Sequence, residues 1–273
     1  MSQMPSRTDA LPGEEEACGW VSCPRPDPGA RLRLLCLPPA GGGALLFRGW
    51  AGRLPGVEVC LVQLPGREAR RHEPPFTHWE PLVQALAAGL EPWLDRPFAL
   101  FGHSMGALLG FELARHLRRM GKREPEALIA SGRNAPSRPW GLPRSSRLSD
   151  DALVLWLRRL GGTPREVLDD PDIRRAILPL VRADMTVCES YTYRPEAPLA
   201  CAITAFGGLQ DPHTDPQGLE AWREECAQGF AARCFAGDHF FLRSAENEVL
   251  VALARELAVP ALGLEKESHQ HVP

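Results

Sequence analysis

Long basic runs and long apolar runs are both missing from this sequence of 273 residues. Its 31 lysines and arginines stand against 34 acidic residues, which gives a formal net charge of -3, and the arginines are scattered. Binding to nucleic acid needs a basic stripe on one face of the protein, so we expect no nucleic-acid partner. No apolar run approaches the roughly 20 residues of a membrane-spanning helix, so we expect no membrane segment.

Cysteine pairs at metal-binding spacing are also missing. None of the eight cysteines forms a CxxC pair, and a chain of this length does not need a disulfide framework to fold. The first 17 residues contain neither a basic start nor an apolar stretch, so we expect no signal peptide. The sequence therefore indicates a cytoplasmic protein with reduced thiols. His269 and His271 fall in a polar tail, which favours solvated side chains over a metal site.

The length of the chain is typical of one large α/β domain. Residues 1–29 are rich in proline, glycine and acidic side chains, which predicts a disordered N-terminal segment. Residues 265–273 are polar and predict a flexible tail. The folded domain is therefore expected over residues 30–264, and we expect it to be a monomer.

Short apolar runs alternate with helical patterns along this domain. Most of the runs are apolar throughout, which is typical of parallel strands covered by helices on both faces. The alternation predicts an α/β fold with an open, mostly parallel central sheet flanked by helices. The expected strands are 31–37, 57–62, 98–101, 127–130, 202–206 and 232–235, and the expected helices are 78–94, 105–120 and 246–257.

Residues 137–198 interrupt this alternation with two helical patterns and no strand. Ser149 is a suitable N-cap for the first helix, which is expected to end at Gly161. The second begins at Asp170, and Pro179 is expected to kink it. A long helical insertion between two strands is where a lid over an active site would lie. Ordinary crossover helices that pack on the sheet are the alternative.

Ser104 stands in a Gly-x-Ser-x-Gly pattern between an expected strand and an expected helix. That context is required of a nucleophile elbow, a strained turn that exposes the serine hydroxyl. Gly102 and Gly106 flank the serine because the strand and the helix approach each other closely at such a turn. The pattern predicts that Ser104 is the nucleophile of a hydrolase.

A nucleophilic serine needs a base and an acid, which in such hydrolases follow the serine in the order acid, histidine. His239 lies in a loop after the last expected strand and is our candidate for the base. Asp211 lies on a turn after the strand 202–206 and is our candidate for the acid. Asp215 is the alternative acid, and either aspartate could instead cap the helix that follows.

The oxyanion formed during the reaction needs backbone N–H donors. Met105, the residue after the nucleophile, is expected to supply one donor. The loop 38–43 is expected to supply the other, from Ala40 first or Gly41 second, because its two prolines have no N–H. This glycine-rich loop lacks both a GxGxxG pattern and a following Gly-Lys-Ser/Thr, so nucleotide binding is not expected.

Several further blocks match one family of hydrolases. They are Pro39–Gly42, Leu64–Glu68 with Arg70, Gly102–Ala107, Ser131–Arg133 with Ala135–Pro136, Arg182–Asp184 with Tyr191 and Tyr193, Asp211–Pro212, and Gly237–Leu242. With these blocks, residues 33–257 resemble the stand-alone type II thioesterases that accompany polyketide synthases and nonribosomal peptide synthetases. Leu64–Glu68 discriminates best, because generic hydrolases lack it. The resemblance implies the α/β-hydrolase fold with an inserted helical lid.

The resemblance implies a specific activity. Such enzymes hydrolyse acyl groups from the phosphopantetheine thiols of acyl or peptidyl carrier domains, and so clear short units that stall a synthase. The assignment of Ser104, Asp211 and His239 agrees with the family pattern, and no cofactor is needed because the phosphopantetheine belongs to the partner. The sequence departs from the pattern at Pro39, in the oxyanion loop, and at Asp238, which places an extra carboxylate beside the expected base.

The motif positions of four arginines suggest contact with an acidic carrier surface or its phosphate. Arginines that are solvated or brace the fold are the alternative interpretation. The four arginines are Arg67, Arg70, Arg71 and Arg133.

A fatty-acid chain-releasing thioesterase, a small-molecule esterase and a catalytically silent binding protein remain alternative functions.

Overall fold

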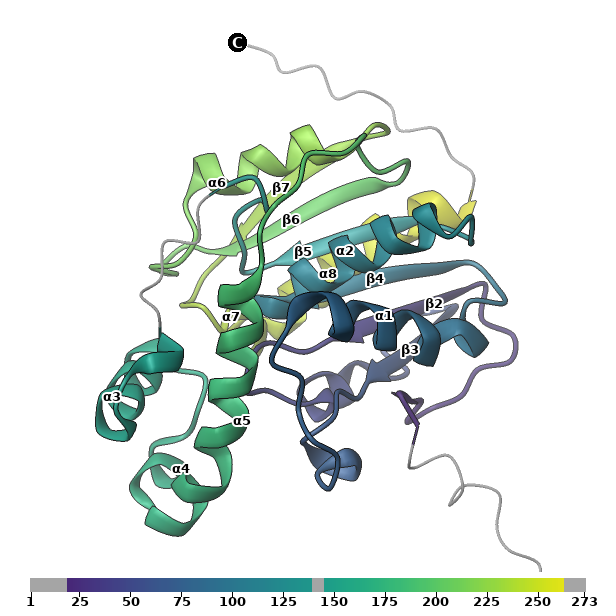
Figure 1. Cartoon of the computed structure of the whole chain (residues 1–273). Coiled ribbons are helices and arrows are strands. Elements are labelled where there is room, and N and C mark those ends of the chain that lie inside the picture. Colours follow the sequence, from purple (N-terminus) through teal and green to yellow (C-terminus); the bar gives the residue numbers. More distant parts are fainter. Residues whose placement is uncertain (1–18, 139–144, 263–273) are drawn as a thin grey trace, which may run out of the picture.

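Seven strands form one sheet in the computed structural model, which describes residues 19–138 and 145–262 (Figure 1). The strand order is β1-β3-β2-β4-β5-β6-β7, and all neighbours are parallel except the antiparallel pair β1 and β3. The six expected strands and the mostly parallel sheet are therefore confirmed. The strands are β1 (Val21–Ser22), β2 (Leu32–Leu37), β3 (Val57–Val62), β4 (Phe98–His103), β5 (Ala127–Ser131), β6 (Ala202–Gly208) and β7 (Phe230–Phe235).

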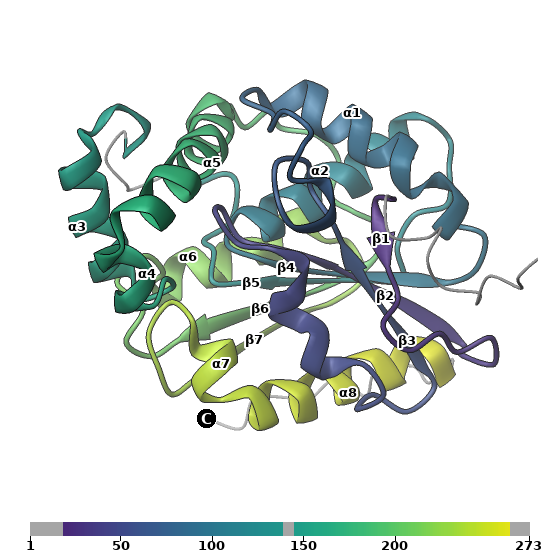
Figure 2. The same ribbon diagram turned by 90° about the horizontal axis from the view of Figure 1, so that it is seen from below.

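Helices cover both faces of the sheet (Figure 2). Successive side chains of a strand point to opposite faces. Leu100 of β4 therefore packs in a core with α1 (Trp79–Leu90) and α2 (Met105–Arg119), and Phe101 packs in a second core with α8 (Glu246–Leu262). The apolar strands predicted this two-sided burial. Among the described helices, none combines the length and the apolar character that a bilayer crossing requires.

Short helices complete the described part of the chain. The short helices outside residues 145–190 are η2 (Ala44–Trp50), η3 (Glu68–Arg70), η4 (Glu91–Trp93), α6 (Pro216–Glu220), η6 (Ala221–Glu225) and α7 (Phe241–Ser244).

Residues Ser145–Ser190, here called the helical insert, lie beside the sheet rather than between its strands (Figures 1 and 2). The predicted caps are confirmed: Ser149 accepts a hydrogen bond from the amide of Ala152, and Gly161 ends α3 in the left-handed conformation. A short helix between the two expected ones was not predicted. The insert contains η5 (Ser145–Arg147), α3 (Asp150–Leu160), α4 (Arg165–Asp169) and α5 (Pro171–Ser190), which continues through Pro179.

The N-terminal prediction of disorder is wrong for residues 19–29. Val21 and Ser22 form β1, which pairs with Val62 and Leu61 at the edge of the sheet. Pairing with an existing strand orders this segment, although its composition alone favours disorder. The folded part therefore begins earlier than residue 30. Residues 1–18 and 265–273, the rest of the two predicted flexible segments, lie outside the described residues.

Candidate active site

The turn between β4 and α2 has the geometry of a nucleophile elbow. Ser104 has φ 55° and ψ −110°, a combination that non-glycine residues rarely adopt. A Cβ atom on Gly102 would lie 2.0 Å from the carbonyl oxygen of Gly106, and one on Gly106 would lie 2.1 Å from that of Leu37. Only glycine fits at these two positions, which explains the pattern seen in the sequence.

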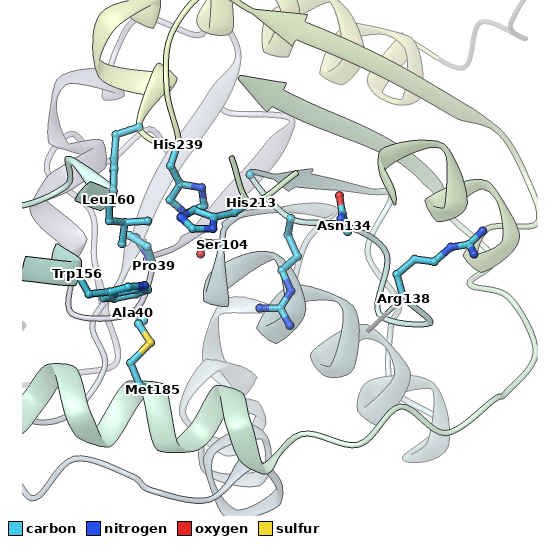
Figure 3. A pocket seen from close by; sticks show the side chains of 13 residues that line it. Pro39, Ala40, Ser104, Asn134, Arg138, Trp156, Leu160, Met185, His213 and His239 are labelled. Atoms are coloured by element: carbon cyan, nitrogen blue, oxygen red, sulfur yellow. The ribbon is translucent and has the colours of Figure 1, made fainter. Parts of the chain in front are cut away.

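His239 and Asp211 come together beside this turn. Their side chains are buried, and the imidazole Nδ1 lies 2.8 Å from Asp211 Oδ2. The other carboxylate oxygen of Asp211 accepts a hydrogen bond from the amide of His213, at 2.9 Å. Asp211 therefore holds the Nδ1 side of the ring, which leaves Nε2 for a partner on the opposite side. Ser104 and His239 line one pocket (Figure 3).

No hydrogen bond joins the Ser104 hydroxyl to His239 within the described residues. Such bonds are often long in enzymes without substrate and shorten when the substrate complex forms. The alternative acid, Asp215, is engaged elsewhere, since its carboxylate accepts hydrogen bonds from the amide of Gly218 at 2.7 Å and from Nδ2 of Asn134 at 3.1 Å. Asp215 thus caps α6, and the structure favours Asp211 as the partner of the histidine.

The oxyanion loop, Pro38–Gly43, follows β2 and reaches the pocket at Ala40. The amide of Gly41, the second candidate donor, is already occupied because it donates to Asp184 Oδ2 at 2.7 Å. In the described ranges, the amides of Ala40 and Met105 donate to no protein acceptor. The geometry therefore favours the first candidate, Ala40, together with Met105 at the start of α2.

The rings of two further histidines, His103 and His213, lie beside the ring of His239. The sequence analysis did not predict that His213 lines the pocket. The ring centroid of His239 lies 5.0 Å from that of His103 and 5.4 Å from that of His213. Burial lowers the pKa of His213 and holds the pKa of His103 well below its ordinary value. Both rings therefore favour the neutral form and add little charge around the candidate base. The signal for His213 was its position on the same turn as Asp211.

The helical insert forms an apolar wall of the pocket, and more polar residues line the opposite side (Figure 3). Trp156 and Leu160 come from α3, and Met185 comes from α5. The insert therefore lines the pocket that Ser104 and His239 also line, which is where a lid would lie. The polar side is lined by Arg133, Asn134 and Arg138.

Two of the four arginines predicted to meet a carrier are buried, so that prediction is wrong for them. Arg67 forms an ion pair with Asp184 at 2.8 Å, and both side chains are almost fully buried. Arg70 donates to Glu73 and to the carbonyl oxygen of Gln63, and its guanidinium stacks on the ring of Trp20 at 4.0 Å. These two arginines brace the fold, as the alternative interpretation held, because their donors are used inside the protein.

The other two arginines have different surroundings. Arg71 is exposed on the surface. Arg133 lines the pocket, and burial lowers its pKa to about 10.

Asp238, where the sequence departs from the family pattern, lies next to His239 in the chain and accepts a hydrogen bond from the amide of Phe240 at 2.8 Å. Whether Asp238 also influences His239 stays a prediction.

Comparisons with known proteins identify the family to which the chain belongs. Residues 32–257 match the profile of the thioesterase domain. The gramicidin S biosynthesis protein GrsT of Aneurinibacillus migulanus is 44% identical over 229 residues, which cover 84% of this chain and 90% of GrsT.

Two solved structures are similar over most of the chain. The type II thioesterase BorB from the borrelidin biosynthetic cluster has a TM-score of 0.80 and 41% identity, covering 87% of this chain and 97% of BorB. YbtT, the type II thioesterase of the yersiniabactin pathway, has a TM-score of 0.80 and 30% identity, covering 89% and 99%. The chain belongs to the thioesterase family of the α/β-hydrolase fold, and within it to the type II thioesterases of nonribosomal peptide and polyketide pathways.

Proposed function

We propose that Ser104, His239 and Asp211 form a catalytic triad that hydrolyses acyl groups from the phosphopantetheine thiols of carrier domains. The observation that carries the proposal is the buried 2.8 Å contact between His239 and Asp211 at the pocket that Ser104 lines. This is the arrangement in which a carboxylate fixes the tautomer of a histidine that acts as a base. Membership of the type II thioesterases supports the choice of substrate.

The first half of the reaction is acyl transfer to the enzyme. His239 Nε2 accepts the proton of the Ser104 hydroxyl as the oxygen attacks the thioester carbonyl carbon. The N–H groups of Ala40 and Met105 stabilise the oxyanion. The carbon–sulfur bond then breaks, and the departing phosphopantetheine thiolate receives the proton from His239. Asp211 stabilises the imidazolium between these two proton transfers.

The second half of the reaction releases the acid. A water molecule attacks the acyl-serine carbonyl while His239 accepts one of its protons. The same two backbone donors hold the second oxyanion, and the serine oxygen leaves with the proton from His239. The net result is one acid and one free carrier thiol for each water consumed, which returns a blocked carrier domain to use.

The apolar wall of Trp156, Leu160 and Met185 supports an acyl chain as the group that is bound. Short aberrant units are the substrates that an editing enzyme would clear. The same wall also favours a second candidate, the release of longer fatty acyl chains. A series of acyl lengths on one carrier domain separates the two, because an editing enzyme should hydrolyse acetyl and propionyl groups readily.

The test uses purified protein and carrier domains loaded with acetyl, propionyl or longer acyl chains, with intact carrier mass as the measurement. Wild-type protein should remove the acyl groups, and Ser104→Ala should not. A fluorophosphonate probe should label the wild type and spare this variant. Intact acyl carriers beside rapid hydrolysis of small esters would contradict the carrier substrate while leaving the triad standing.

Arg71 is the exposed member of the arginine block and the remaining surface candidate for a carrier contact. Arg71→Glu should raise KM for an acyl-carrier substrate and leave KM for a small thioester unchanged, because only the carrier brings an acidic surface. Arg175→Glu, at an exposed site on α5, is the matched control. An equal rise of KM for both substrates would remove Arg71 from the proposal.

A further inference from the structure

The oxyanion loop turns sharply at the residues that flank Ala40. The amide of Gly42 donates to the carbonyl oxygen of Pro39 at 3.0 Å, which closes a four-residue turn. Gly41 has φ 69°, the positive value that the third position of a type II turn requires. The central peptide of a turn, here between Ala40 and Gly41, can point in one of two opposite directions, which distinguish type I from type II turns. The groups that bond to this peptide therefore decide which direction it keeps.

Asp184 of α5 holds it from the helical insert. Its Oδ2 accepts the amide of Gly41 at 2.7 Å. Arg67 donates to both carboxylate oxygens of Asp184 at 2.8 Å, and its Nη1 also donates to the carbonyl oxygen of Gly42 at 2.8 Å. The side chains of Arg67 and Asp184 are 6% and 3% exposed, so these charge-assisted bonds are shielded from water. The loop is therefore held at its central peptide, through the Gly41 amide, and again at the carbonyl group of Gly42.

Packing closes the loop from two directions. A Cβ atom on Gly41 would lie 2.8 Å from Cγ2 of Val181, one turn before Asp184 on α5. At the far end of the loop, the carboxylate of Glu68 accepts the amides of Ala44 and Leu45 at 3.0 Å each. The loop thus lies between the insert and the turn that carries Arg67 and Glu68, with no room for a larger side chain at Gly41.

We infer that Asp184 and Arg67 are positioning residues that set the oxyanion loop, so that the oxyanion donor is formed only while α5 of the insert is seated against it. The inference rests on the proposed function, in which the Ala40 amide is one of the two donors. Asp184 touches no reacting atom in this scheme. Any outward movement of α5 carries Asp184 and Val181 away from Gly41, which frees the peptide next to Ala40. Closure of the insert and completion of the oxyanion hole are then one event.

The test compares Asp184→Ala with Asp184→Asn on an acyl-carrier substrate. Loss of one oxyanion donor costs roughly 10²-fold to 10³-fold in kcat in other hydrolases. Asp184→Ala should therefore lower kcat by about 10²-fold with little change in KM. Asp184→Asn keeps a carbonyl oxygen for the Gly41 amide and should recover part of the loss. An alkyl boronic acid, which forms a tetrahedral adduct on Ser104, should bind more weakly to Asp184→Ala by a similar factor.

A matched buried ion pair provides the control for stability. Arg33 and Glu58 pair at 2.8 Å in strands β2 and β3, with side chains 10% and 7% exposed, and contact no residue of the pocket. Glu58→Gln should lower the melting temperature but keep kcat and boronic acid affinity at temperatures where it is folded. If Asp184→Ala behaves like Glu58→Gln, with only its stability reduced, the positioning role is wrong. Turnover by Ser104→Ala would instead overturn the proposed function itself.

Discussion

The sheet and the helical insert meet at the catalytic pocket, but they are built differently. Two large clusters of buried side chains cover the two faces of the sheet. The insert has one small cluster of its own, and it leaves Leu155 58% exposed and Ile173 40% exposed. Regions with few buried contacts open at a lower free energy than the core of a domain. The sheet is therefore the more rigid of the two regions, although Val187 and Cys188 tie the end of α5 to one of the large clusters.

The two regions also bring different chemistry to the pocket. The proposed triad of Ser104, Asp211 and His239 follows strands of the sheet. The insert lines the pocket with apolar side chains, and its Asp184 accepts a hydrogen bond from Gly41 in the loop that reaches the pocket. In the proposed mechanism, the chemical step therefore belongs to the sheet and contact with the acyl chain belongs to the insert. Asp184 is the exception, because through it the insert also affects the chemical step.

The largest effect is expected from a change on the sheet side that leaves the insert untouched. Asp211→Asn should lower kcat by about 10⁴-fold, because the amide favours the wrong tautomer of His239. Release of acyl groups from a carrier domain measures this loss. Asp215→Asn is the matched control, since that carboxylate caps α6, and it should cost little turnover. Comparable losses in the two variants would show that the acid has been misassigned.

The elbow around Ser104 and the strands of the sheet could be predicted because the signals for them are local in the sequence. Gly102, Ser104 and Gly106 lie within one turn, and the order of acid and histidine after the serine restricts the choice of partners. Parallel strands could be predicted from their apolar composition. Each of these features depends on residues that are close together in the chain or on a rule for the whole fold.

Features that depend on distant pairs were missed. Arg67 and Asp184 are 117 residues apart, so no pattern in the sequence shows that they pair, and the sequence left open whether Arg67 meets a carrier or braces the fold. The thiols of Cys23 and Cys60 lie 3.0 Å apart only because β1, which composition had assigned to disorder, pairs with β3. In both cases the tertiary contact, rather than local propensity, decides the structure.

A second prediction compares the packing of the two regions directly. Leu100 of β4 and Leu153 of α3 are both fully buried, so truncation of either to alanine should cost about 2–5 kcal/mol within its own cluster. Leu100→Ala should lower the melting temperature of the whole domain. Leu153→Ala should mainly speed amide exchange within residues 145–190. Hydrogen exchange with mass spectrometry tells the two apart, and a uniform response to Leu153→Ala would mean that sheet and insert unfold together.

A smaller effect is expected from the wall that the insert gives the pocket. Trp156→Ala enlarges the space beside Ser104 and should shift the preference toward longer acyl chains by about tenfold in kcat/KM, the lower end of what one methylene contact in an apolar pocket contributes. Leu155→Ala on the same helix is the matched control, because that side chain is exposed and lines no part of the pocket. An unchanged ratio of short-chain to long-chain turnover in Trp156→Ala would show that the insert does not select the substrate.

The smallest effect concerns the loss of folding stability in mild acid. We expect the histidines behind this loss to lie outside the insert, because residues 145–190 contain no histidine. Burial, followed by the charge of His239, holds the pKa of His103 well below its ordinary value of 6.5. The unfolded chain therefore binds a proton below pH 6.5 that the folded chain does not. The stability that this group contributes is therefore present above pH 6.5 and is lost progressively as the pH falls below that value.

His103→Gln isolates that contribution, because glutamine stays neutral and still offers a hydrogen-bond partner to the Ser131 hydroxyl. The variant is expected to be less stable than the wild type at pH 7.5, since it loses packing against His239 and Phe241. Its free energy of unfolding should nevertheless fall less steeply between pH 6.5 and 5.5, as measured by urea denaturation at each pH. If the free energy of unfolding falls equally steeply with pH in both proteins, His103 is not the source of the acid sensitivity. This contrast between the sheet and the insert would then be wrong.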